Sequence, residues 1–105
     1  MFSVKLGGRA QADVDHIYKW INAKSARGAI NWYGAFLDAA AKLRVDPARH
    51  PKALDCEHLS EEIRECFFRT PRGRSYRLLF VIRSSEVRIL RVRGPGQPPI
   101  TDDDC

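Results

Sequence analysis

Arginines are concentrated in one segment of the sequence, between Glu62 and Arg93. Nine arginines and three glutamates give this segment a net charge of +6, whereas nine Lys/Arg against ten Asp/Glu leave the rest at −1. A guanidinium group donates hydrogen bonds in a planar fork that matches phosphate oxygens. The clustering predicts a surface for phosphate-bearing or acidic partners, although a basic face can also serve only solubility. The arginines expected to bind a target or its phosphates are Arg69, Arg72, Arg74, Arg91 and Arg93.

The cysteines and histidines give no comparable indication of a metal or nucleophilic site. Cys56, Glu57 and His58 are neighbouring residues with ligand chemistry, but a zinc site needs a second ligand pair. Neither His50 nor His58 has a serine or cysteine at a catalytic spacing. We therefore expect no metal and no cofactor. Three cysteines without a Cys-x-x-Cys motif suit a reduced, cytosolic chain.

Length and composition indicate one domain. The chain has 105 residues, a mass of 12.0 kDa and a pI of about 9.4. We expect the domain to span residues 1–95 and a Pro/Gly-rich, acidic tail to occupy residues 96–105. The sequence contains neither the apolar region of a secretory signal nor about 20 consecutive apolar residues. A cytoplasmic protein that does not enter a membrane is the expectation.

The arginine-rich segment is predicted to form three antiparallel strands. The strands are expected at residues 63–68, 76–82 and 87–92. The second is continuously apolar, which implies burial on both faces. Residues 70–74 contain proline, glycine and two arginines and predict a basic turn, whereas residues 84–85 predict a tight hairpin connection.

A strand and two helices are predicted before this segment. Residues 2–6 alternate in polarity until Gly7, and Ser25 is placed to cap the second helix. The expected apolar helix faces consist of Ala10, Val14, Ile17 and Ile21 in the first helix, and of Ala29, Trp32, Tyr33, Phe36, Ala40 and Leu43 in the second. We expect the tryptophans and tyrosines of these helices to lie in the core. The predicted fold is α+β, in the order β-αα-βββ, with a helical hairpin packed on a small, largely antiparallel sheet.

This order and four local patterns resemble the RelE/ParE superfamily of bacterial type II toxins. The patterns are residues 12–21, a helix at residues 29–43 before a proline-marked loop, Ile63-Arg64-Glu65 followed by Tyr76-Arg77-Leu78-Leu79-Phe80, and the basic strand at residues 87–93. The resemblance extends from Val4 to about Arg93. It implies a growth-inhibiting toxin that a cognate antitoxin neutralises.

The resemblance also implies roles for particular residues. Arg77 matches the arginine of the family's Tyr-Arg pair and is expected to contact a scissile phosphate, with Arg64 on the neighbouring strand sharing that role. Proton transfer would depend on Glu65 and Tyr76, because no histidine or tyrosine follows Tyr76. Arginine is a poor general base, since its pKa stays above about 12.

Three functions are compatible with these residues. The lack of a good proton-transfer group favours a toxin that binds DNA gyrase, as ParE-like members do. The alternative is a metal-independent mRNA endoribonuclease that acts on the ribosome, as RelE-like members do. A non-toxic nucleic-acid-binding module is the third possibility, but the sequence offers no aromatic residues interleaved with basic ones on an exposed face. An acidic antitoxin segment would be attracted to the basic sheet and the helical hairpin.

Overall fold

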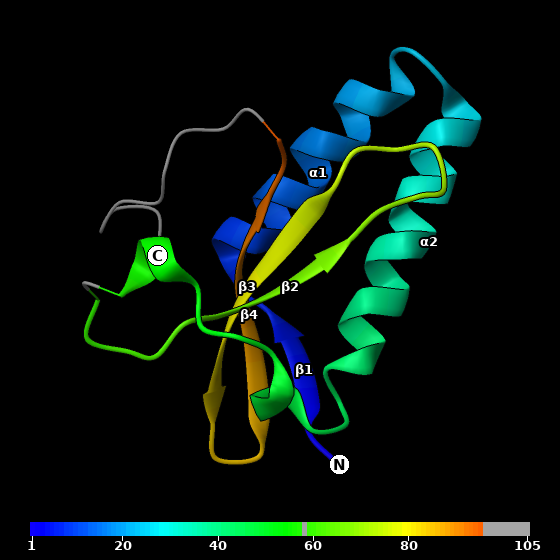
Figure 1. Cartoon of the computed structure of the whole chain (residues 1–105). Helices are drawn as coiled ribbons and strands as arrows, with labels where there is room; N and C mark the ends of the chain where they lie inside the picture. The colour runs from blue at the N-terminus through cyan, green and yellow to red at the C-terminus, as the bar shows by residue number, and fades with distance from the viewer. Residues whose placement is uncertain (58, 96–105) are drawn as a thin grey trace.

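The chain folds as a four-stranded sheet with two helices on one face (Figure 1). The computed structural model describes residues 1–57 and 59–95. The elements, in chain order, are β1 (Ser3–Leu6), α1 (Gly8–Asn22), α2 (Ala26–Lys42), the short 3₁₀ turns η1 (Pro47–Arg49) and η2 (Leu54–Cys56), β2 (Arg64–Phe68), β3 (Tyr76–Arg83) and β4 (Glu86–Arg93). The predicted order β-αα-βββ is confirmed. The predicted tail, residues 96–105, lies outside the described residues.

The strands follow the order β1-β4-β3-β2 across the sheet. β1 is parallel to β4, and the other two pairs are antiparallel, so the sheet is largely antiparallel as predicted. The hairpin between β3 and β4 turns at Ser84, whose φ is 55°. β1 pairs with β4 only as far as Ile89. The residues of β4 after Ile89 therefore have no neighbouring strand on the β1 side, and another element must cover that edge.

The two helices form an antiparallel hairpin whose inner stripes pack on the sheet. Ser25 caps α2 as predicted, because its Oγ accepts a hydrogen bond from Gly28 N at 2.9 Å. Trp32 is buried against the sheet. Trp20 and Tyr33, in contrast, are 55% and 40% exposed, so the prediction that they lie in the core is wrong. Trp20 and Tyr33 lie beside the apolar stripe of α1 and α2, respectively, and only these stripes face the sheet.

The opposite face of the sheet is covered in part by the segment that contains η2. Ala53, Cys56 and Ile63 pack there against Leu79 and Val81 of β3. Figure 1 shows η2 and α2 on opposite sides of the strands. Because layers cover both faces, four consecutive residues of β3, 78–81, are buried, as the apolar run predicts. Within residues 1–57 and 59–95, no helix is long and apolar enough to cross a membrane.

Candidate functional site

Arg77 lies on the face of the sheet away from the helices. It is directly opposite Phe67 of β2 and Arg93 of β4, and residues directly opposite each other project from the same face. Glu65 projects there too, because side chains two residues apart in a strand share a face. We define the far face as Glu65, Phe67, Arg77 and Arg93 with the adjacent η2. The far face contains the arginine that was predicted to contact phosphate.

Arg64 lies on the other face, towards the helices. It is opposite the buried Phe80, and its guanidinium donates a hydrogen bond to His50 O at 2.6 Å. Arg64 also forms an ion pair with Glu62, at 3.1 Å. The expectation that Arg64 and Arg77 share one phosphate is therefore wrong. The two-residue period of the strands places their side chains on opposite faces of the sheet.

Tyr76 also lies on the helix face, where its ring belongs to an aromatic cluster. Its ring centroid is 5.5 Å from that of Trp32 and 5.9 Å from that of Phe68. A Cβ atom at Gly94 would lie 2.8 Å from Tyr76 Cε2, so glycine is needed for this close packing. Burial raises the pKa of the Tyr76 hydroxyl, which makes it a weaker acid. Tyr76 and Glu65 therefore cannot act together on one substrate phosphate.

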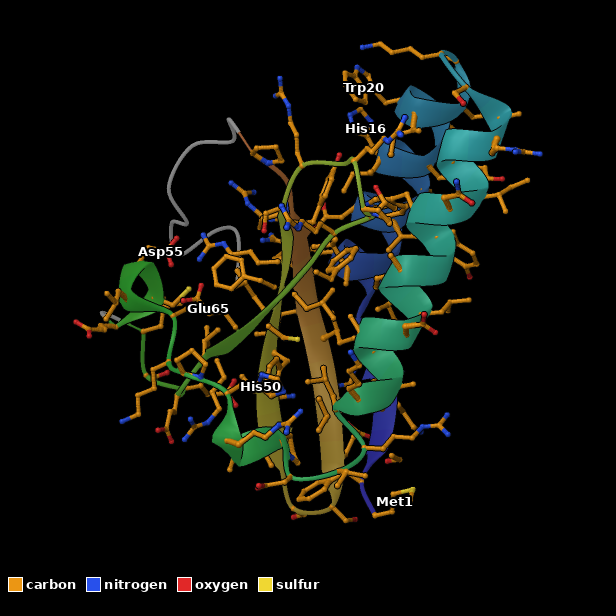
Figure 2. The ribbon with its side chains drawn as sticks, turned by 45° about the vertical axis from the view of Figure 1, so that its right-hand side comes forward. Met1, His16, Trp20, His50, Asp55 and Glu65 are labelled. Atoms are coloured by element: carbon orange, nitrogen blue, oxygen red, sulfur yellow. The ribbon has the colours of Figure 1, made fainter. Side chains whose placement is uncertain are left out.

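Two carboxylates hold the Arg77 guanidinium. Arg77 donates to both oxygens of Asp55, one of them at 3.0 Å, and to Glu65 at 2.8 Å. The three side chains are 21%, 26% and 15% exposed, respectively. The hydrogen bonds to Asp55, and then those to Glu65, raise the pKa of Arg77 against the opposing effect of burial. Figure 2 shows Asp55 and Glu65 side by side at η2 and β2. The positive charge of Arg77 is thus neutralised inside the protein.

Arg91 is also part of an internal ion pair. Its guanidinium donates to both carboxylate oxygens of Asp13, at 2.7 and 2.9 Å. Asp13 accepts a further hydrogen bond from Val92 N at 3.0 Å. This carboxylate from α1 takes the place of a neighbouring strand, because β1 pairs with β4 only as far as Ile89. Arg91 was predicted to bind a target, but in the structure it joins α1 to β4.

Three of the arginines predicted to bind a target lie on the loop between β2 and β3. Arg69, Arg72 and Arg74 are all exposed, and the described part of the chain provides no ion pair for them. A Cβ atom at Gly73 would lie 2.1 Å from Thr70 Oγ1, so a larger residue there would force the Thr70 side chain to move. The guanidinium groups of this loop, unlike that of Arg77, are available to an external partner.

Sequence reasoning missed two exposed apolar residues on the far face. Phe67 is 60% exposed, and Leu54 of η2 is exposed as well. The alternation along β2 could have identified Phe67, because the strand's buried residues, Cys66 and Phe68, flank it on the opposite face. Large exposed aromatic and aliphatic side chains next to arginines are typical of protein-binding surfaces.

A groove runs between α2 and the edge strand β1. Its volume is about 250 Å³, and Tyr33, Leu37 and Arg44 line it together with residues of β1. Ile30 continues the exposed apolar stripe of α2 towards the start of the helix. Among residues 1–57 and 59–95, no group of three His, Cys, Asp or Glu side chains is placed to hold a metal ion.

Two helices on one face of a mixed four-stranded sheet define a small α+β fold. One solved structure with this fold is described as "Chromosomal ParDE TA system from P. aeruginosa". It aligns with a TM-score of 0.67 and 19% sequence identity, over 90% of this chain and 96% of that one. A sequence profile described as "ParE toxin of type II toxin-antitoxin system, parDE" matches residues 4–97. The chain therefore belongs to the ParE family of type II toxins. A search of curated proteins gave no match.

Proposed function

We propose that this toxin stops growth by binding DNA gyrase and does not cleave mRNA. The observation that carries this proposal is the pairing of Arg77 with Asp55 and Glu65. A ribonuclease of this architecture would need that arginine to stabilise the charge that develops on a phosphate. Here two carboxylates satisfy the guanidinium and would repel an incoming phosphate. Gyrase acts on the chromosome, so the proposed site of action is the cytoplasm.

The proposed surface for gyrase is the far face. Phe67 and Leu54 expose apolar area there, and Glu65 and Arg77 are partly exposed beside them. Arg93, which was predicted to bind a target, belongs to the same face but is only 6% exposed. A protein interface requires such anchors surrounded by polar groups, whereas a nuclease site requires a proton donor and acceptor. The two residues predicted for proton transfer do not meet on this face, since Tyr76 lies on the other one. The far face is therefore better suited to binding than to catalysis.

The proposed surface for the antitoxin is the groove between α2 and β1. Ile30, Tyr33 and Leu37 expose apolar side chains at helical spacing, and Arg44 lies at the groove. An amphipathic segment with apolar residues on one side and acidic residues near Arg44 would match both features. The far face and this groove have no residue in common, and β4 is the one element that contributes to both. Target binding and antitoxin binding can therefore be tested separately.

Inducible expression of the chain, with and without the neighbouring open reading frame, tests the toxin activity. Growth should stop when the chain is expressed alone and resume when the neighbour is co-expressed. Plasmid supercoiling by purified gyrase then identifies the target, with primer extension on cellular mRNA as the comparison. The proposal requires loss of supercoiling while the mRNA stays intact. Codon-specific cuts in the mRNA, lost in Arg77→Ala, would instead establish a nuclease.

A matched pair of substitutions assigns the two surfaces. Phe67→Ser should abolish gyrase inhibition but retain antitoxin binding, and Leu37→Ser should do the reverse. Both side chains are exposed, so neither substitution removes a core contact. Gyrase inhibition by Phe67→Ser at the wild-type concentration would show that the far face is not the target surface.

A further inference from the structure

A pocket of about 270 Å³ lies between α1, the loop from β2 to β3, and the end of β4. Its lining consists of His16, Ile17, Trp20, Arg74, Tyr76, Gly94 and Pro95. None of these residues belongs to the far face or to the groove beside β1. The lining combines an exposed indole ring, an exposed guanidinium and the edge of a tyrosine. This combination suits a ligand that has both a planar ring and a negative charge.

Trp20 provides the planar surface. Its side chain is 55% exposed, and the Nζ atom of Lys24 lies 3.7 Å from the ring centroid. His16 and Trp20 are four residues apart, which places them on one side of α1, and Lys24 follows just beyond the end of the helix at Asn22. Figure 2 shows His16 and Trp20 in this arrangement near the upper end of α1. Sequence reasoning placed Trp20 in the core and for that reason found no exposed aromatic residue among basic ones.

Arg74 provides the positive charge. It lines the pocket from the loop that also carries Arg69 and Arg72, and all three side chains are exposed. Within the described ranges, no carboxylate forms an ion pair with any of them. Exposed arginines next to an aromatic ring are the two components that single-stranded nucleic acids require, one for the backbone and one for the base. The loop therefore supplies a phosphate contact at the side of the pocket.

We propose that this pocket binds one nucleotide of a single-stranded nucleic acid. The base stacks on Trp20, and Arg74 contacts the adjacent phosphate. The pocket volume of about 270 Å³ is just below the usual range of small-molecule sites, which begins at about 300 Å³, so the pocket suits one base and not several. A duplex is a poor ligand because its bases are already stacked and paired. The proposed site does not depend on whether the toxin binds gyrase.

The fluorescence of the two tryptophans can report directly on binding of the nucleic acid. Trp32 is buried, whereas Trp20 is exposed in the pocket, so a stacked base quenches Trp20 selectively. Titration of the full-length chain with a short oligothymidylate at low salt should quench and blue-shift the exposed tryptophan emission. The same strand labelled with fluorescein gives the dissociation constant by anisotropy. Absence of both signals would overturn the proposal.

Three substitutions separate stacking from general charge attraction. Trp20→Ala should weaken binding of the labelled strand by roughly tenfold, within the range for loss of one base–aromatic stack. Arg74→Ala should lower the slope of log affinity against log salt by about 0.7, the value for one phosphate contact on a single strand. Arg49→Ala removes the same charge from exposed η1 outside the pocket and should change neither the slope nor the quenching. Equal effects of Arg74→Ala and Arg49→Ala would contradict the assigned site.

Competition experiments show whether the pocket recognises the base or only the charge of the phosphate. Unlabelled oligothymidylate should displace the labelled strand at lower phosphate concentration than inorganic polyphosphate or a duplex of the same length. Equal competition by polyphosphate would show that only charge is recognised and would overturn the stacking role of Trp20. Stronger competition by poly-glutamate would identify an acidic peptide as the ligand and would also overturn the proposal.

Discussion

Replacement of Arg77 by methionine should destabilise the protein strongly, because Asp55 and Glu65 would lose their shared counter-charge. The two carboxylates would then face each other with side chains only 26% and 15% exposed. Removing one partner of a fully buried ion pair costs about 3–5 kcal/mol. Because this cluster is partly exposed, we expect Arg77→Met to lower the free energy of unfolding by about 2–3 kcal/mol. Methionine fills much of the arginine's volume, so the loss reports on charge more than on packing.

Arg83→Met is the matched control, since it removes the same residue type from the same strand. Arg83 pairs with Glu61, but both side chains are 48% exposed. An exposed pair contributes little to stability, because water solvates both charges and salt screens them. Arg83→Met should therefore shift the unfolding midpoint only slightly, whereas Arg77→Met should lower the melting temperature by roughly 10 °C or more.

Urea unfolding, followed by tryptophan fluorescence and far-UV circular dichroism, measures both free energies. The double variant Arg77→Met/Asp55→Asn should recover part of the loss, because it removes the negative charge of one of the two carboxylates that contact Arg77. Such a coupling would be about 0.5–3 kcal/mol for contacting residues. If Arg77→Met and wild type unfold at the same midpoint, Arg77 is not a structural cation. In that case its availability for phosphate would have to be reconsidered.

Three further predictions concern single residues. Asp13→Ala should reduce stability more than Asp13→Asn, because asparagine keeps an acceptor for Val92 N; the free energies of unfolding from urea titrations should differ by about 1 kcal/mol. His50 has a pKa below its ordinary value of 6.5, chiefly because of burial, so the unfolded chain takes up the proton more readily. Stability should then fall as the pH drops below about 6.5, and His50→Phe should remove this part of the pH dependence in urea titrations at different pH. Gly94→Ala should displace the ring of Tyr76, because the new Cβ would lie 2.8 Å from Tyr76 Cε2. We expect the free energy of unfolding to fall by about 1–3 kcal/mol, and an unchanged melting temperature would refute the steric argument.

Local patterns predicted the elements of this fold well. The apolar run in β3 predicted burial on both faces, and residues 78–81 are all buried. Ser25 was predicted as a helix cap from its type and position, and its Oγ accepts from Gly28 N. Periodicity and capping depend on residues close together in the sequence. They can therefore be inferred without knowledge of the tertiary structure.

The pairing of the arginines could not be predicted in the same way. Asp55 precedes Arg77 by 22 residues, and Asp13 precedes Arg91 by 78. Which carboxylate reaches which guanidinium depends on how η2 and α1 are placed over the sheet. Exposure of Trp20 likewise depends on where α1 lies on the strands. The sequence reveals that the segment is basic, but the fold decides which arginines remain exposed.

The internally paired arginines and the exposed arginines have different roles. Arg77 and Arg91 are internal cations that hold η2 and α1 to the sheet. Arg72 and Arg74, on the loop between β2 and β3, are exposed to external partners. The positive charge of the segment is therefore partly structural, whereas Arg72 and Arg74 remain exposed on the loop that leads into β3, close to the internally paired Arg77.

Inhibition of gyrase is the most direct test of the proposed function. Purified gyrase should lose its ability to supercoil relaxed plasmid when the purified chain is added, and Phe67→Ser should restore supercoiling. Full supercoiling at a large molar excess of the folded chain would contradict the proposal that gyrase is the target.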